Sequence, residues 1–336
     1  MKKMFTNKKL LLSLLAIIMV VMLAACGGSG TNKPSATPSA SAPVISTEPA
    51  ASNAPEQPAE AQTSYPFTIK DSSGFELTIE KAPAKVVSIL SSETEILYAI
   101  GAGEQVVGVD EYSNYPAEAA EKPKVGDVTT NIEAVLALEP DLVFASSTMN
   151  TSAVEQLRAL NINVYATDPK TYDEVVEKIE WIGKIMNKQK EAAAVAQHMQ
   201  SVKTEVTSKV KDAAKKSVYF EVSEGWTVGG GEFIDQLITL VGGSNIAAEQ
   251  TGWFEVNNEQ VIKQNPEIIL FSSYGGETSS IIDGLAARPG WDAIEAVKNK
   301  AIFPINDDHV SRVGPRLADA LLEMSAAVHP ELFGAK

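Results

Sequence analysis

The sequence predicts an α/β protein made of two similar lobes that are joined by one long helix. Three observations support this fold class. Short β-branched runs alternate with amphipathic stretches, two parts of the chain resemble each other, and the region between them shows helical periodicity without a strand signal. Alternating strands and helices form layered units on largely parallel sheets.

The predicted elements fall into two sets. β-Branched runs predict strands at 85–90, 106–109, 142–144 and 162–165, and then at 217–222, 268–271 and 301–305. Amphipathic stretches predict helices near 93–100, 131–138, 152–160, 232–241, 257–264 and 313–328.

The region between the two sets predicts the long helix. Apolar residues recur there at spacings of three and four, at Val195, Met199, Val202, Val206 and Val210. This spacing places them on one face of a helix. A helix over 188–213 would be about 39 Å long at 1.5 Å per residue, so it would join two lobes or lie across both.

The two halves are also similar to each other. Aligning Pro140 with Pro266 pairs residues 131–136 with 257–262, and places Glu133 and Glu259 at the same position. Both copies read as a short helix, a proline stop and a buried strand. Upstream, residues 96–101 resemble 237–242. This weak similarity predicts two lobes built alike.

Composition excludes several classes of function. The formal net charge of −15 argues against binding to a nucleic acid backbone. One cysteine in 336 residues excludes an intramolecular disulfide and a cysteine-based zinc or iron–sulfur site. Three histidines, at 198, 309 and 329, leave little material for a multi-histidine metal site, so no metal site and no cofactor are expected.

The N-terminus is predicted to be a targeting segment. A basic stretch with four lysines precedes an apolar run over 10–25, which is too short to span a bilayer. The run ends in Leu-Ala-Ala-Cys-Gly, which resembles a bacterial lipobox and implies cleavage before Cys26 and lipidation of its thiol. Residues 1–25 are thus predicted to be a signal peptide. The Pro-, Ser- and Ala-rich residues 26–64 are expected to form a disordered linker. Removing the leader changes the formal charge to −19.

The folded part resembles the lipoprotein solute-binding proteins of ABC importers for cobalamin, ferric siderophores and haem. The resemblance covers residues 84–334 and depends on the order of several short motifs. These are 87–90 with Thr94-Glu95 to Gly101, 107–109 with 112–116, 124–127, 131–143, 240–246, 259–266, Arg288-Pro-Gly-Trp291, and Gly314-Pro-Arg316 to Phe333.

The resemblance implies an architecture and a function. The fold would be two Rossmann-like lobes, 65–187 and 214–336, joined by a rigid helix over 188–213, with the ligand in the cleft between them. The protein would be a monomeric receptor, anchored on the extracytoplasmic face of the cell membrane, that delivers cobalamin to a permease dimer with its ATPase. Glu133 and Glu259 would dock on arginines of that permease. Without the resemblance, each is an ordinary carboxylate in the first turn of a helix.

Three aromatic residues are predicted to contact the ligand. Tyr112 follows the strand at 106–109, and the carboxyl ends of strands are where α/β proteins collect ligands. Trp226 and Trp253 lie in glycine-rich segments that match cleft aromatics of the cobalamin-type members. Flat aromatic walls suit a large planar ligand such as a corrin or a porphyrin. The alternative for each is a surface-loop or core position, as expected for Trp181 and Trp291.

The loop after the last strand supplies the polar candidates. Asp308 would accept hydrogen bonds from corrin amides, and Arg312 would pair with a carboxylate or phosphate of the ligand. His309 could ligate the metal of haem or cobalamin, with Tyr112 opposite it, or be polar surface only. Few cations accompany these aromatics, so cobalamin is favoured, followed by a ferric siderophore and then haem.

No enzyme is expected. The sequence has no His-Glu-x-x-His motif, Walker loop, nucleophile elbow or cysteine nucleophile. The glycines at 229–231 precede a predicted helix and could bind an anion, although a tight turn is the commoner role. A surface lipoprotein that acts as a sensor or scaffold remains the alternative from another class.

Overall fold

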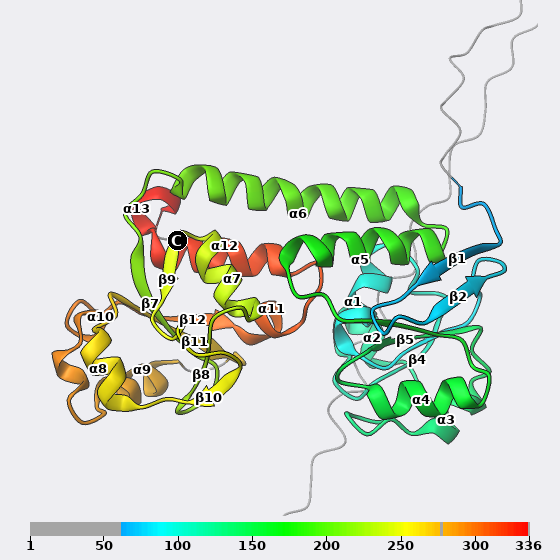
Figure 1. The fold of residues 1–336 in the computed structure, drawn as a ribbon, viewed down its shortest axis with the longest axis horizontal. Helices are drawn as coiled ribbons and strands as arrows, with labels where there is room; N and C mark the ends of the chain where they lie inside the picture. The colour runs from blue at the N-terminus through cyan, green and yellow to red at the C-terminus, as the bar shows by residue number, and fades with distance from the viewer. Residues whose placement is uncertain (1–61, 276–277, 335–336) are drawn as a thin grey trace, which may run out of the picture. The chain divides into compact units, whose positions relative to one another are not determined.

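The computed structural model describes residues 62–275 and 278–334, and it has the two lobes and the long helix that the sequence predicts (Figure 1). The predicted leader 1–25, Cys26 and all but the last three residues of the predicted linker 26–64 lie outside the described residues. Within the described ranges, no helix is long and apolar enough to cross a bilayer.

The N-lobe, residues 62–187, is built on a parallel sheet with the strand order β4-β3-β5-β6. Its elements in chain order are β1 (Phe67–Lys70), β2 (Glu76–Ile79), β3 (Val86–Ser88), α1 (Ser91–Ala99), β4 (Val106–Val109), α2 (Ala117–Ala120), α3 (Ile132–Ala137), β5 (Leu142–Ser146), α4 (Thr151–Ala159), β6 (Val164–Thr167) and α5 (Tyr172–Ile185). The strands β1 and β2 form a separate antiparallel hairpin.

The C-lobe, residues 211–334, is built on a second parallel sheet with the order β12-β11-β7-β9. Its elements are β7 (Lys216–Glu221), β8 (Trp226–Val228), α7 (Phe233–Leu240), β9 (Gly243–Asn245), β10 (Trp253–Glu255), α8 (Asn258–Gln264), β11 (Ile268–Ser273), α9 (Ser279–Ala286), the 3₁₀ turn η1 (Trp291–Ala293), α10 (Glu295–Lys298), β12 (Ile302–Asn306), α11 (Asp307–Ser311), α12 (Leu317–Val328) and α13 (Pro330–Phe333). The strands β8 and β10 pair as an antiparallel ribbon.

The long helix between the lobes is α6, which runs Gln189–Val210 and is about 33 Å long at 1.5 Å per residue. Its buried stripe includes Met199, Val202 and Val206, as the apolar spacing predicts. In Figure 1 it lies along one edge of both lobes, next to α5 and α12. Its partners come from both lobes, so it is part of the core and not only a connection.

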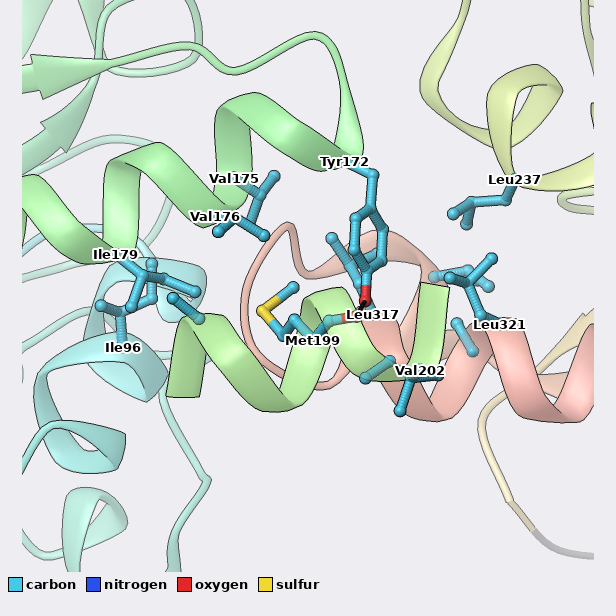
Figure 2. Close-up of a cluster of buried hydrophobic side chains, with 14 of the residues drawn as sticks. Ile96, Tyr172, Val175, Val176, Ile179, Met199, Val202, Leu237, Leu317 and Leu321 are labelled. Carbon is cyan, nitrogen blue, oxygen red and sulfur yellow. Dashed lines mark hydrogen bonds between the residues drawn. The ribbon is translucent and has the colours of Figure 1, made fainter. Parts of the chain in front are cut away.

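One hydrophobic cluster runs through both lobes. It contains side chains of both sheets and of α1, α5, α6, α7 and α12. Figure 2 shows Ile96 of the N-lobe and Leu237 of the C-lobe at either end of the cluster, with α6 residues between them. Tyr172 is also fully buried there and donates a hydrogen bond from its hydroxyl to the carbonyl of Met199, at 2.9 Å. The two lobes therefore share a core along α6.

Local signals explain where several helices begin and end. Asn131, Thr171 and Asn257 are N-cap residues whose side chains accept hydrogen bonds from backbone N–H groups of α3, α5 and α8. After α1 and α7 the chain reverses at Gly101 and Gly242, both with positive φ, which glycine adopts without strain. These are the aligned glycines of the internal repeat.

The first described residues are held on the turn between α5 and α6. The Thr63 N–H donates to Asn187 Oδ1 at 2.8 Å, and its hydroxyl donates to the carbonyl of Lys184 at 2.7 Å. Tyr65 donates to the carbonyl of Ile185 at 2.8 Å. Thr63, placed in the linker by its composition, is thus part of the folded N-lobe.

Candidate functional site

A cavity of about 640 Å³ lies between the lobes and is lined by both. This size falls within the range of about 300–1,000 Å³ that is usual for ligand pockets. The N-lobe lines it with residues at the carboxyl ends of β3, β4, β5 and β6, and the C-lobe with residues that follow β11 and β12. The carboxyl ends of parallel strands are where α/β folds bind ligands.

In the N-lobe, the loop after β4 presents Tyr112 to the cavity, with 56% of its surface exposed. Asp110 holds this loop: its carboxylate accepts hydrogen bonds from Ser113 Oγ and, at 3.0 Å, from the N–H of Tyr112. Lys124 Nζ donates to the carbonyls of Asp110 and Ser113 at 3.2 and 2.9 Å. Burial raises the pKa of the Asp110 carboxyl above its usual range, although these hydrogen bonds and Lys124 oppose the shift.

In the C-lobe, the cavity is lined by α11 and by Tyr274, which follows β11 and is 82% exposed. Asn306 caps α11 by accepting a hydrogen bond from the N–H of Asp308 at 3.0 Å. This cap fixes Asp308 at the cavity. Tyr274 is a lining aromatic that sequence reasoning missed, although it lies, like Tyr112, in the loop that follows a buried strand.

The charges around the cavity are unbalanced. Among its described lining residues are six carboxylates and two cations, Lys178 and Arg312. Both cations are engaged: Lys178 Nζ lies 3.3 Å from Glu93 Oε1, and Arg312 pairs with Glu95 at 3.0 Å and Asp308 at 2.8 Å. The carboxylates are Glu93, Asp110, Asp127, Asp168, Asp307 and Asp308. The same pairs neutralise Glu93 and Asp308, and Lys170 pairs with Asp168 at 2.8 Å, so the net negative charge of the lining comes from the remaining carboxylates.

The other predicted ligand contacts lie elsewhere. Trp226 and Trp253 are half exposed on the ribbon of β8 and β10, and neither is among the described lining residues of the cavity. His309 is not among them either, and its Nδ1 lies 2.7 Å from Glu323 Oε1. The structure thus brings Tyr112, Asp308 and Arg312 together at the cavity and leaves the two tryptophans and His309 outside its lining.

Comparison with known proteins identifies the family. The family model described as periplasmic binding protein matches residues 86–308. The chain belongs to the periplasmic binding protein family. That family is one of extracytoplasmic solute-binding proteins, not of enzymes. The chain is 36% identical, over 80% of its length and 87% of the relative, to an uncharacterized ABC transporter substrate-binding lipoprotein of Bacillus subtilis.

Other relatives and solved structures give the same family. The chain is 31% identical, over 70% of its length and 86% of the relative, to a vitamin B12-binding protein of Vibrio cholerae. The solved periplasmic vitamin B12-binding protein of Vibrio cholerae matches with a TM-score of 0.65 and 29% identity, over 73% of this chain and 96% of that one. A periplasmic haem-binding protein of Roseiflexus matches with a TM-score of 0.65 and 26% identity, over 73% and 97% of the two chains.

In this periplasmic binding protein, Glu133 and Glu259 occupy equivalent places. Each is exposed in the first turn of a short helix, α3 or α8, two residues after an asparagine N-cap. In Figure 1 these helices lie at the edge of their lobes opposite α6. The two carboxylates are thus presented alike by the two lobes.

The glycines at 229–231 have a packing role. A side chain on Gly229 or Gly230 would place its Cβ 2.1 or 2.3 Å from the carbonyl oxygen of Gln250 or Ala248. Their N–H groups donate to the carbonyls of Gly252 and Gln250 at 2.9 and 2.7 Å. The tight-turn interpretation is therefore the right one, because the donors that an anion would need are already used.

The remaining tryptophans and the metal-ligating residues are also located. Trp291 is fully buried beside Tyr219, as expected for a structural residue, whereas Trp181 lies on α5 beside Lys184 and is 41% exposed, so it is not the packed residue that was expected. Within residues 62–275 and 278–334, no group of three or more His, Cys, Asp or Glu side chains is arranged to hold a metal ion.

Proposed function

We propose that this protein captures cobalamin outside the cytoplasm and delivers it to the permease of an ABC importer, from a lipid anchor at Cys26. The negative cavity lining carries the proposal. A ligand rich in N–H donors and without net negative charge suits a lining in which carboxylates outnumber cations and both cations are already paired. The side-chain amides of a corrin are such donors. Relatives named as cobalamin- or vitamin B12-binding proteins support the same ligand.

The same lining disfavours the two other ligands. Ferric siderophore complexes are usually anionic, and the carboxylates would repel them while no free cation among the described lining residues would attract them. Haem carries two carboxylates and needs an axial ligand. His309, the proposed histidine ligand, is turned to Glu323 instead. A siderophore is therefore the second candidate and haem the third.

We place the ligand between aromatic residues of opposite lobes. Tyr112 of the N-lobe and Tyr274 of the C-lobe line the cavity, and Asp308 adds a hydrogen-bond acceptor that is fixed by the α11 cap. Trp226 and Trp253 would extend the wall along the ribbon that follows β7. Their exposed rings offer stacking surface to the part of a large ligand that projects from a cavity of about 640 Å³.

Binding measurements test the ligand assignment. Isothermal titration of the purified chain with cobalamin should give saturable heats, while a panel of ferric siderophores and haem should bind more weakly. Flat heats with cobalamin and tight binding of either alternative would refute the assignment. The charge argument has its own test: Asp127→Asn with Asp307→Asn should weaken cobalamin binding, and Asp283→Asn, on the exposed face of α9, should not.

A cellular measurement separates transport from the sensor or scaffold function. Deleting the gene should abolish cobalamin uptake, and expression of the intact chain should restore it. Normal uptake after deletion, with cobalamin binding intact in vitro, would favour the sensor or scaffold.

A further inference from the structure

We infer that Glu95 is a positioning residue that clasps the two lobes together and thereby sets the spacing of the cleft for its ligand. Glu95 belongs to α1 of the N-lobe and is 3% exposed. Both of its carboxylate oxygens accept hydrogen bonds from arginines of the C-lobe. Arg312 donates to it at 3.0 Å, and Arg316 donates through two nitrogens at 2.9 and 2.6 Å.

Further polar contacts join the lobes at the same place. Arg312 also donates to Asn114 Oδ1 of the N-lobe at 2.8 Å, and Arg316 stacks on the ring of Tyr115 at 4.2 Å. Lys178 of α5 donates to the carbonyl of Val313 at 2.9 Å. The C-lobe partners all lie in residues 312–316, between α11 and α12. We call this set of contacts the clasp.

The clasp forms a wall of the ligand cavity. Asn114, Lys178, Arg312 and Val313 line the cavity on one side, while Glu95, Tyr115 and Arg316 line a separate groove of about 800 Å³. The clasp therefore lies between the two hollows. Its place also revises the role of Arg312, because its guanidinium already donates to Glu95 and Asn114 and pairs with Asp308, so a ligand carboxylate or phosphate would compete with these partners.

Charge and geometry make this joint specific. A buried carboxylate that loses its cations is strongly disfavoured, so Glu95 resists separation from Arg312 and Arg316. Fully satisfied polar networks in low-dielectric surroundings favour one arrangement over its neighbours. The apolar contacts along α6 hold the lobes at one edge, but they are less directional. The clasp adds the directional restraint beside the ligand.

The test compares two buried glutamates of the same kind. Glu95→Gln removes the charge between the lobes. Glu221→Gln is the matched control, because Glu221 is also buried and pairs with both terminal nitrogens of Arg288, at 2.6 and 2.7 Å, entirely within the C-lobe. Both variants should lose thermal stability. Only Glu95→Gln should weaken cobalamin binding, by about tenfold or about 1.4 kcal/mol, through faster dissociation.

A second readout does not depend on the ligand. Without ligand, amide hydrogen exchange in residues 110–116 and 312–316 should be faster in Glu95→Gln than in the wild type and in Glu221→Gln. Unchanged exchange there would overturn the clasp, as would unchanged affinity in a chain that binds cobalamin. If Glu95→Gln fails to fold, Arg316→Lys, which keeps the charge and loses the two-nitrogen contact, should show the same pattern more weakly.

The measurement of cobalamin affinity rests on the proposed function, whereas the measurement of hydrogen exchange does not. A wild-type chain that fails to bind cobalamin would refute the ligand, and the exchange rates would still decide for or against the clasp.

Discussion

The two lobes have the same scaffold and different edges. If the four strands of each parallel sheet are numbered in chain order, both sheets have the order 2-1-3-4. In both, the helix between strands 1 and 2 ends at a glycine with positive φ, and the helix before strand 3 begins at an asparagine cap. The internal repeat that the sequence suggests is therefore present in the topology.

The difference lies at the carboxyl ends of the first strands. In the N-lobe, α1 begins three residues after β3, so its first turns bring Glu93 to the cavity and Glu95 to the clasp. In the C-lobe, the strand β8 and the glycines 229–231 come between β7 and α7. The comparison shows that repetition supplies the scaffold, while insertions at one edge give each lobe its own contacts.

The largest effect is expected on uptake, from the two glutamates that occupy equivalent positions in the two lobes. Glu133→Ala combined with Glu259→Ala should abolish cobalamin uptake by cells and leave the Kd for cobalamin unchanged, because both carboxylates are exposed and lie outside the cavity lining. Each single substitution should lose part of the uptake. Glu155→Ala with Glu295→Ala, which removes one exposed helical acid from each lobe, is the control. Full uptake by the first pair would disprove a docking role.

The next largest effect is expected on stability, from a substitution in the segment of β8 and glycines 229–231 that only the C-lobe has. Gly230→Ala should lower the free energy of unfolding by about 1–3 kcal/mol, since the new Cβ would lie 2.3 Å from the carbonyl oxygen of Ala248. Urea titration measures this. Gly284→Ala, inside α9 with open space around it, should instead add about 0.5–1 kcal/mol. Equal effects of the two would show that the close approach is not maintained in solution.

The equivalent caps should differ slightly. Asn131→Ala and Asn257→Ala should each cost about 1 kcal/mol of stability. The cost should be larger for Asn257, whose side chain accepts from two N–H groups, than for Asn131, which accepts from one. Thermal unfolding of the two variants under the same conditions gives the order, and the reverse order would contradict this reading of the caps.

The smallest effects concern pH and have opposite signs in the two lobes. Burial raises the pKa of Asp110, so its destabilising contribution, present above that pKa, disappears as the pH falls toward 3.8. For Glu331, slight burial is outweighed by hydrogen bonds to His329 and Lys216, which lower the pKa to about 2. Its stabilising contribution is present above pH 4.5 and is lost as the pH falls toward 2.

Unfolding curves between pH 6 and 3 can separate the two groups. As the pH falls, the wild type should gain stability relative to Asp110→Asn and lose stability relative to Glu331→Gln. Parallel curves for all three chains would contradict both assignments.

The parts of the fold that were predicted are those with strong local periodicity. All seven predicted strands are present, from Val86–Ser88 to Ile302–Asn306, and the long helix lies inside the predicted range. The hairpin of β1 and β2, the ribbon of β8 and β10, and the sheet strand β9 were missed. Their short runs include polar or exposed positions, whereas the equally short β3, β4 and β6 are almost wholly buried β-branched runs. Short strands without such a run are defined by their partners and not by their own pattern.

The candidate site was predicted only in part, because local sequence signals locate the ends of strands but not the contacts between distant residues. Tyr112 and Asp308 follow strands, so their places at the cavity could be inferred from the carboxyl-end rule. Glu95 and Arg312 are separated by 217 positions along the chain, and nothing local connects them. The sequence predicted that Arg312 could contact a ligand, and the structure shows that Arg312 already donates a hydrogen bond to Glu95.

The shared core along α6 also links the burial of the N-lobe to residues near the end of the chain. Its largest cluster includes Leu317, Leu321 and Val328 of α12, close to the C-terminus, and Ile96 of α1. The face of the N-lobe that packs in this cluster therefore cannot be fully buried until residues 317–328 are present. A chain cut before α12 should therefore leave apolar side chains of the N-lobe exposed, and such surface makes partly folded chains prone to aggregate.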